Sequence, residues 1–148
     1  MIELGVVEVA KRIKQIHTED VVLIKYGSFY HCYGKDAYIM SYLYDYQIKK
    51  AGVNVACVGF PENSLIKIQR ILEDEFVNYV VIDKSSNYEV IEIQDKNKDN
   101  KYSNLYSKAH TYVSTKNKIG EINQYLLSNI GEEFIKNKLQ RIEDIIYE

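Results

Sequence analysis

The chain has 148 residues, of which 46% are hydrophobic and 27% charged. This is the balance of a globular protein of about one domain, and it excludes a disordered or fibrous chain. The formal net charge of −2 argues against a generally basic nucleic-acid binder. Charge is unevenly spread, however, because residues 95–118 hold six lysines and two aspartates. That segment is the candidate surface for electrostatic contact with nucleic acid. The commoner explanation of a lysine-rich loop is that its side chains are simply solvated.

Cysteine usage and the apolar pattern bear on the compartment. Cys32 and Cys57 are too few for a disulfide framework or a zinc site and fit a reducing environment. Glu3 stands where a secretory signal would be basic, and no apolar run approaches the length of a membrane span. We therefore expect a cytoplasmic protein that contacts no membrane and holds no metal or cofactor.

The first predicted elements are a helix and a hairpin. Apolar residues recur at helical spacing up to His17. Residues 21–26 and 29–33 then read as two short strands joined through Gly27 and Ser28. Phe29 would lie beside the turn, where a ring can insert into a base stack. Spacing alone favours the alternative, a core aromatic on a strand.

The next segment alternates helices and strands. Residues 35–51 are predicted as one helix that ends at Gly52, and residues 53–60 as a buried strand. A helix through Glu75 and strands over 77–83 and 88–93 follow. This order is typical of crossover α/β units. We expect a mixed sheet of about five strands with helices on its faces.

The C-terminal third is predicted to be a helical tail. Residues 94–103 read as a polar loop, 105–113 as weakly helical, and 119–146 as an amphipathic helix broken near Gly131. We assign residues 1–94 to the α/β domain and 95–148 to an extension that packs on it. The alternative is that its apolar face binds a partner or a second copy of the chain.

The sequence Y-G-S-F-Y-H-C-Y-G-K-D-A at residues 26–37 resembles the mismatch-recognition motif of the MutS N-terminal domain, domain I, which runs G-D-F-Y-E, an apolar pair and D-A. Ser28 replaces the family's Asp and His31 its Glu. The resemblance extends over residues 7–83, including a basic residue before the motif and a G-F-P sequence. Lys25 stands where the family commonly has Arg, and Gly59 to Pro61 resembles its G-V-P. The positions at the family's spacing in the motif are Gly27, Phe29, Tyr30, Asp36 and Ala37.

The resemblance implies a domain that meets DNA from the minor-groove side, with Phe29 stacked on a mispaired base. His31 would bond that base, although imidazole offers other donors and acceptors than a carboxylate; otherwise it is a half-exposed strand histidine. Lysines of residues 96–118 would contact phosphates. The expected DNA-binding residues are Lys25, Ser28, Phe29, Tyr30, His31, Lys96, Lys98 and Lys101.

Features of the complete repair enzyme are missing from the sequence. No G-x-x-x-x-G-K-[ST] phosphate loop is present, so no ATPase is expected. No local signature pairs a cysteine with a histidine, and we expect no catalytic residue. The resemblance therefore predicts a stand-alone recognition domain for mismatched or distorted double-stranded DNA. A separate repair protein, or a second copy of the chain bound through the C-terminal helix, is the further candidate partner. The alternative function is a protein-interaction module that keeps the fold without DNA binding.

Overall fold

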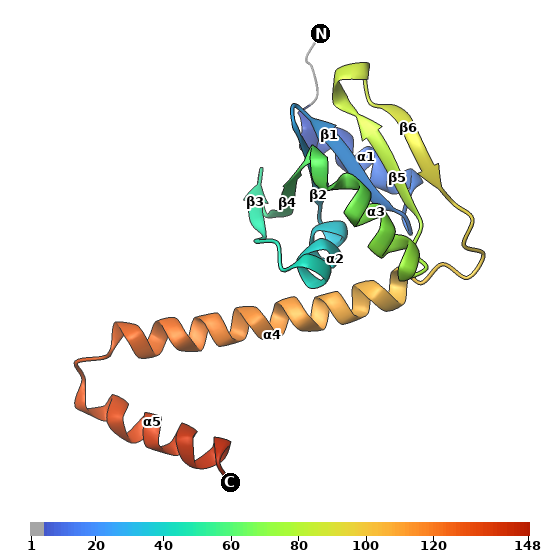
Figure 1. The fold of residues 1–148 in the computed structure, drawn as a ribbon. Helices are drawn as coiled ribbons and strands as arrows, with labels where there is room; N and C mark the ends of the chain where they lie inside the picture. The colour runs from blue at the N-terminus through green and yellow to red at the C-terminus, as the bar shows by residue number, and fades with distance from the viewer. Residues whose placement is uncertain (1–4) are drawn as a thin grey trace. The chain divides into compact units, whose positions relative to one another are not determined.

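The computed structural model describes residues 5–148; Glu3, on which the expectation of no secretory signal rests, lies outside the described residues. The chain forms two compact units, one ending at Val113 and one spanning Ser114–Glu148. The elements (Figure 1) are α1 (Val6–Ile16), β1 (Val21–Tyr26), β2 (Phe29–Tyr33), α2 (Lys35–Tyr44), β3 (Lys49–Ala51), β4 (Val55–Pro61), η1 (Glu62–Ser64), α3 (Leu65–Asp74), β5 (Tyr79–Asp83), η2 (Lys84–Ser86), β6 (Glu89–Gln94), α4 (Tyr102–Ser128) and α5 (Glu133–Ile146).

The first unit is built on one mixed sheet of six strands in the order β3-β4-β2-β1-β5-β6. β1 and β5 run parallel, while the other neighbouring pairs are antiparallel. Short connections join three of the antiparallel pairs, β1–β2, β3–β4 and β5–β6, whereas α2 and β3 lie between β2 and β4 in the chain. A crossover connects the parallel strands β1 and β5. The predicted α/β class and mixed sheet are confirmed, with one strand more than the expected five.

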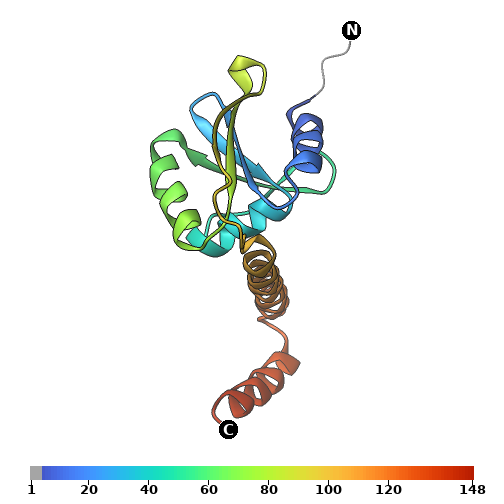
Figure 2. The ribbon, with the colours of Figure 1, turned by 90° about the vertical axis from the view of Figure 1, so that its right-hand side faces the viewer.

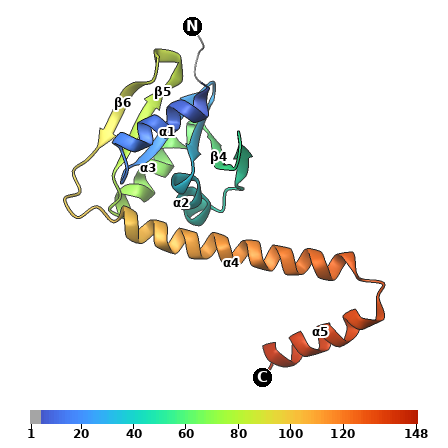
Figure 3. The ribbon, with the colours of Figure 1, turned by 180° about the vertical axis from the view of Figure 1, so that it is seen from behind.

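Helices cover both faces of this sheet, as the side view shows (Figure 2). α1 covers one face, where Ala10 packs with Val22, Ile24, Val80 and Ile82. α2, α3 and the start of α4 cover the other, which presents the alternate residues of β1 and β5 (Figure 3). Successive side chains of a strand point to opposite faces, and helices cover both faces of β1 and β5. Both strands are therefore apolar at nearly every position.

The helix expected over residues 35–51 is the main local difference. α2 ends at Tyr44 because Asp45 adopts the left-handed conformation, φ 56°. The chain then forms β3, which pairs with the start of β4. Gly52, φ 57°, lies in the turn between these two strands and does not end a helix. Lys49 and Lys50, which are typical of the last turn of a helix, therefore belong to a short edge strand.

The start of α4 belongs to the first unit. Tyr102, Leu105 and Ala109 are buried in its main core. α4 begins earlier than the weak helix predicted from residue 105, because these residues gain a buried stripe that local propensity does not reveal. The division after Val113 thus lies later than the expected boundary after residue 94.

A buried carboxylate ties α1, β1, α2 and α4 together. Asp36, 1% exposed, accepts hydrogen bonds from Lys14 Nζ at 2.8 Å, Tyr102 Oη at 2.6 Å and the Val22 backbone N–H at 3.0 Å. Burial raises the pKa of Asp36, and these donors oppose that shift. Such a carboxylate is tolerated in a core because its oxygens are satisfied.

The second unit consists of the later part of α4 and α5. α4 ends at Ser128 and α5 begins at Glu133, so the break falls around Gly131 as predicted. Ile135 is buried, and Lys138 Nζ lies 2.7 Å from Tyr125 Oη and over the Tyr125 and Phe134 rings. Within residues 5–148, no helix is long and apolar enough to cross a membrane.

Candidate functional site

The β1–β2 hairpin forms a corner of the sheet. Gly27 has φ +64°, a conformation that glycine adopts without strain, and this lets Tyr26 pair directly with Phe29. Phe29 is 46% exposed and Tyr26 is 49% exposed. The sequence places two aromatic rings at this tip because the turn is only two residues long. Both are available for contact with another molecule.

A row of aromatic side chains continues from this tip along one face of β2. Phe29, His31 and Tyr33 share this face by strand alternation. The His31 ring lies 6.2 Å from the Tyr26 ring, 6.5 Å from Phe29 and 6.4 Å from Tyr33, centroid to centroid. We call Tyr26, Phe29, His31 and Tyr33 the aromatic row. It offers a surface on which flat groups can stack.

His31 lies across a glycine of the neighbouring strand. Its partner in the β2–β4 pair is Gly59, where a Cβ atom would meet His31 Cδ2 at 3.2 Å and Nε2 at 3.3 Å. His31 Nδ1 is buried and, among the described residues, has no hydrogen-bond partner. Burial lowers the pKa of His31, which favours the neutral imidazole. A hollow of about 470 Å³ adjoins this ring and is lined by Phe29, His31, Gln47, Lys49, Cys57 and Gly59.

Tyr30 is placed differently from the expected DNA contact. It is 6% exposed and stacks on Phe60 with 5.6 Å between ring centroids, on the face opposite Phe29. The physical reason is the strand period, which sends neighbours of Phe29 to the other face. Tyr30 therefore supports the hairpin from within the core, and the expected contact is corrected.

Ser28 and Lys25 lie at the same end of the sheet as Phe29. Ser28 is exposed in the turn, and its carbonyl oxygen accepts from the Glu62 backbone N–H at 2.9 Å. Lys25 Nζ lies 3.0 Å from the Glu62 carboxylate, so part of its charge is already compensated. Both residues thus border the aromatic tip without belonging to its row.

The lysine-rich loop lies at the other end of the sheet. Asn97 bonds Asn78, whose carbonyl oxygen accepts from the N–H of Val21 at the start of β1. Phe29 pairs with the last residue of β1, so the length of this strand separates the loop from the tip (Figure 1). The structure therefore does not bring the loop lysines together with Phe29; these lysines are Lys96, Lys98 and Lys101.

Sequence reasoning missed a different lysine. Lys84, the first residue of η2, has its Nζ 4.0 Å from the centroid of the Tyr26 ring. The available signal was its position directly after β5, whose last residue pairs with Lys25. Because β5 runs parallel to β1, the residue after β5 arrives beside the hairpin tip. Predicting this required knowing that the two strands are neighbours.

Comparison with known protein families gives a match over the segment that carries this tip. A family model described as MutS domain I matches residues 5–89, more than half of the chain. No match was found among curated proteins. The matched segment includes the aromatic row and Lys84 and ends before the lysine-rich loop. The shared part of the fold is thus the part that carries the exposed aromatic tip.

Proposed function

Because the chain belongs to the MutS domain I family, we propose that it recognises mismatched or distorted double-stranded DNA through the β1–β2 tip. The observation that carries this proposal is the 46% exposed ring of Phe29 at a two-residue turn inside the matched segment. An aromatic ring fixed at a corner is suited to insertion between bases. Core packing, the other interpretation of Phe29, would bury that ring.

Selectivity would come from the cost of opening the duplex. Inserting an apolar ring requires unstacking, and unstacking costs least where base pairing is already poor. The tip would therefore read deformability rather than base identity. This mechanism needs an exposed ring and a firm base beneath it, and the buried Tyr30 and Phe60 stack supplies that base.

We propose that His31 contributes to stacking beside Phe29 and does not replace the hydrogen bond that the family's Glu makes to the base. Its ring lies against Gly59, and its Nδ1 atom is buried. With a lowered pKa it is mostly neutral at pH 7, so it adds little charge to the tip. We propose that it limits how far Phe29 tilts and extends the stacking surface.

The phosphate contacts are assigned to cations near the tip. Lys84 stands over Tyr26, and Lys25 lies on the adjacent strand position with Glu62 beside it. Lysine side chains of this kind contribute sequence-independent affinity that falls with salt. Few such cations and a net charge of −2 predict weak binding.

A fluorescence anisotropy titration tests the proposal. The probes are two labelled duplexes of the same sequence, one fully paired and one with a single unpaired base, at low salt. We expect tighter binding to the distorted duplex and loss of that preference in Phe29→Ala. Phe76→Ala is the matched control, because Phe76 is 59% exposed and borders the lysine-rich loop. Equal binding to both duplexes by the unaltered protein would refute the proposal.

A second candidate function rests on the second unit. Apolar side chains that α4, α5 and the turn between them leave exposed there give a surface for a protein partner, including a second copy of the chain. They include Ile119, Ile122, Leu127, Ile130, Phe134, Leu139, Ile142, Ile145 and Ile146. Light scattering tests this: a dimer that Phe134→Ala and Leu139→Ala dissociate, without any DNA binding, would favour the interaction module. We propose no enzymatic activity for either function.

A further inference from the structure

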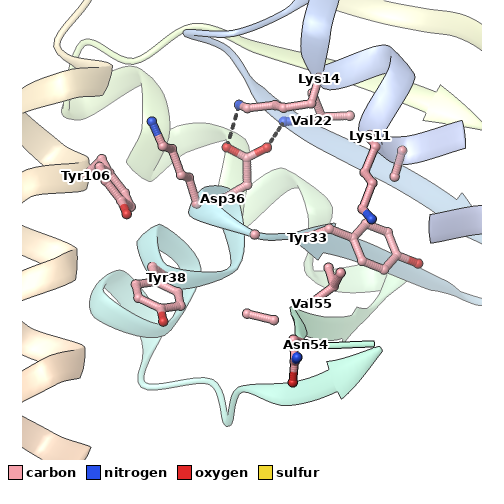
Figure 4. A pocket seen from close by; sticks show the side chains of 13 residues that line it. Lys11, Lys14, Val22, Tyr33, Asp36, Tyr38, Asn54, Val55 and Tyr106 are labelled. Atoms are coloured by element: carbon pink, nitrogen blue, oxygen red, sulfur yellow. Dashed lines mark hydrogen bonds and ion pairs between the residues drawn. The ribbon is translucent and has the colours of Figure 1, made fainter. Parts of the chain in front are cut away.

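A separate pocket lies on the α1 side of the sheet, away from the aromatic tip. It has a volume of about 490 Å³ and is bordered by α1, the end of β2, the start of α2, the β3–β4 turn and the first part of α4. This volume falls within the roughly 300–1,000 Å³ typical of small-molecule sites. Figure 4 shows Asp36 near its centre, with Lys11 and Tyr33 on one side and Tyr38 and Tyr106 on the other.

The pocket carries positive charge. Among its described lining residues, three are lysines and one is an acid, Asp36. Lys14 compensates that acid at 2.8 Å and also donates to the Asp20 carbonyl oxygen at 2.6 Å. Lys11 and Lys35 remain, the first paired at 3.5 Å with an exposed Glu8. An exposed pair of that length competes weakly with an anion in the pocket.

Lys35 and the pocket tyrosines form a second feature. Lys35 Nζ lies 5.1 Å from the centroid of the Tyr106 ring, and the Tyr106 and Tyr38 centroids are 6.4 Å apart. Tyr33 faces them across the pocket (Figure 4). Burial raises the pKa of Tyr33 to about 12, so its hydroxyl group keeps its proton at neutral pH. The remaining wall holds the polar Asn54 and the apolar residues Ala10, Val22, Val55 and Ala56.

We propose that this pocket binds a small molecule that joins a phosphate monoester to a flat ring, the chemistry of a free nucleoside monophosphate. Lys35, which lies over the Tyr106 ring and which Asp36 does not compensate, holds the phosphate; Lys11 lies on the opposite side of the pocket beside Tyr33 (Figure 4). Tyr33, Tyr38 and Tyr106 flank the ring, and the apolar wall excludes water from it. The site does not include Phe29, and it shares only Tyr33 with the aromatic row.

The test is a titration of the full-length, ¹⁵N-labelled protein with adenosine 5′-monophosphate, followed by NMR. We expect saturable shifts at the amides of residues 33–38 and 54–56. Ribose 5-phosphate and adenosine, which each carry half of the chemistry, are expected to bind at least about ten-fold more weakly. Lys35→Ala should weaken binding about five-fold or more, and Lys11→Ala, on the opposite side of the pocket, should weaken it less.

Two control variants locate the effect. Lys67→Ala removes a lysine that also stands over a tyrosine, Tyr44, at 4.8 Å, but outside this pocket. Phe29→Ala removes the DNA tip. Both should leave the affinity unchanged. Absence of saturable shifts, or shifts confined to Tyr26, Phe29 and His31, would overturn the proposal. A 5′-phosphorylated oligonucleotide that binds the pocket more tightly than the free nucleotide would overturn its assignment to a free ligand.

Discussion

At the scale of single residues, the contact between His31 and Gly59 shapes the exposed tip. A Cβ at position 59 would lie 3.2 Å from His31 Cδ2, closer than a normal carbon contact. The imidazole therefore occupies the space that any other residue at position 59 would fill. Glycine is needed here to let the ring lie flat on the neighbouring strand.

Gly59→Ala is expected to lower the free energy of unfolding by about 1 kcal/mol, because overpacking forces the ring to move. In a His31→Ala background the same change should cost clearly less, since the obstructing ring is gone. Urea denaturation of the four proteins of this cycle measures both values. Gly120→Ala is the control; it meets no atom within 4 Å inside α4 and should stabilise the protein slightly. Equal costs in both backgrounds would contradict the contact.

The pH dependence of stability follows from the same histidine. Burial lowers the pKa of His31 below its ordinary 6.5 in the folded state. The unfolded state then binds more protons as pH falls below about 6.5, so stability declines there until His31 is protonated in the folded state too. His31→Gln should reduce this decline between pH 7.5 and pH 5, measured as the urea midpoint. His110→Gln, which alters a ring stacked on Tyr38, serves as the control.

At the scale of elements, the buried Asp36 network holds the first unit together. Asp36→Ala leaves the Tyr102 hydroxyl group and the Val22 N–H without their acceptor in a buried site, and leaves Lys14 with only the Asp20 carbonyl oxygen. We expect a loss of about 3–5 kcal/mol in the free energy of unfolding. Tyr102→Phe, which removes one donor, should cost about 1–2 kcal/mol. Urea unfolding checks both, and the exposed Lys118→Ala should change stability by less than about 0.5 kcal/mol.

Elements with local signals were predictable from the sequence. β1 and β2 were found because apolar and aromatic runs flank a glycine whose positive φ the turn requires. β3 was missed because Ile48 and the lysines after it continue a helical pattern, while the left-handed Asp45 that ends α2 gives no such signal. Tertiary pairing with β4 overrides the local preference there.

The candidate site was predictable only in part. The family-like spacing located Phe29, and its exposure agrees with the expected position of a stacking ring. The burial of Tyr30 followed from strand alternation once β2 was assigned. The position of Lys84 and the distance of the lysine-rich loop depend on the parallel β1–β5 pair, which links residues more than 50 positions apart. Local patterns do not determine such pairings.

At the scale of the whole molecule, the distribution of charge predicts a small salt effect on DNA binding. Lys84→Ala and Lys25→Ala should each reduce the slope of log K against log salt by about one. The triple change of Lys96, Lys98 and Lys101 to alanine should leave that slope nearly unchanged, because these residues lie at the far end of the sheet. Anisotropy titrations at several salt concentrations measure the slopes. If the triple change lowered the slope more than Lys84→Ala or Lys25→Ala, the DNA interface would be assigned to the lysine-rich loop instead.

The hydrogen bond between Tyr102 and Asp36 also has a consequence for the order in which the protein is synthesised. It joins residues 66 positions apart, and Tyr102 follows the end of the family match at residue 89. A growing chain that has just completed the matched segment still lacks the donor that closes its core. The family match is therefore shorter than the packed unit, and final closure of the first unit must wait until the start of α4 has left the ribosome.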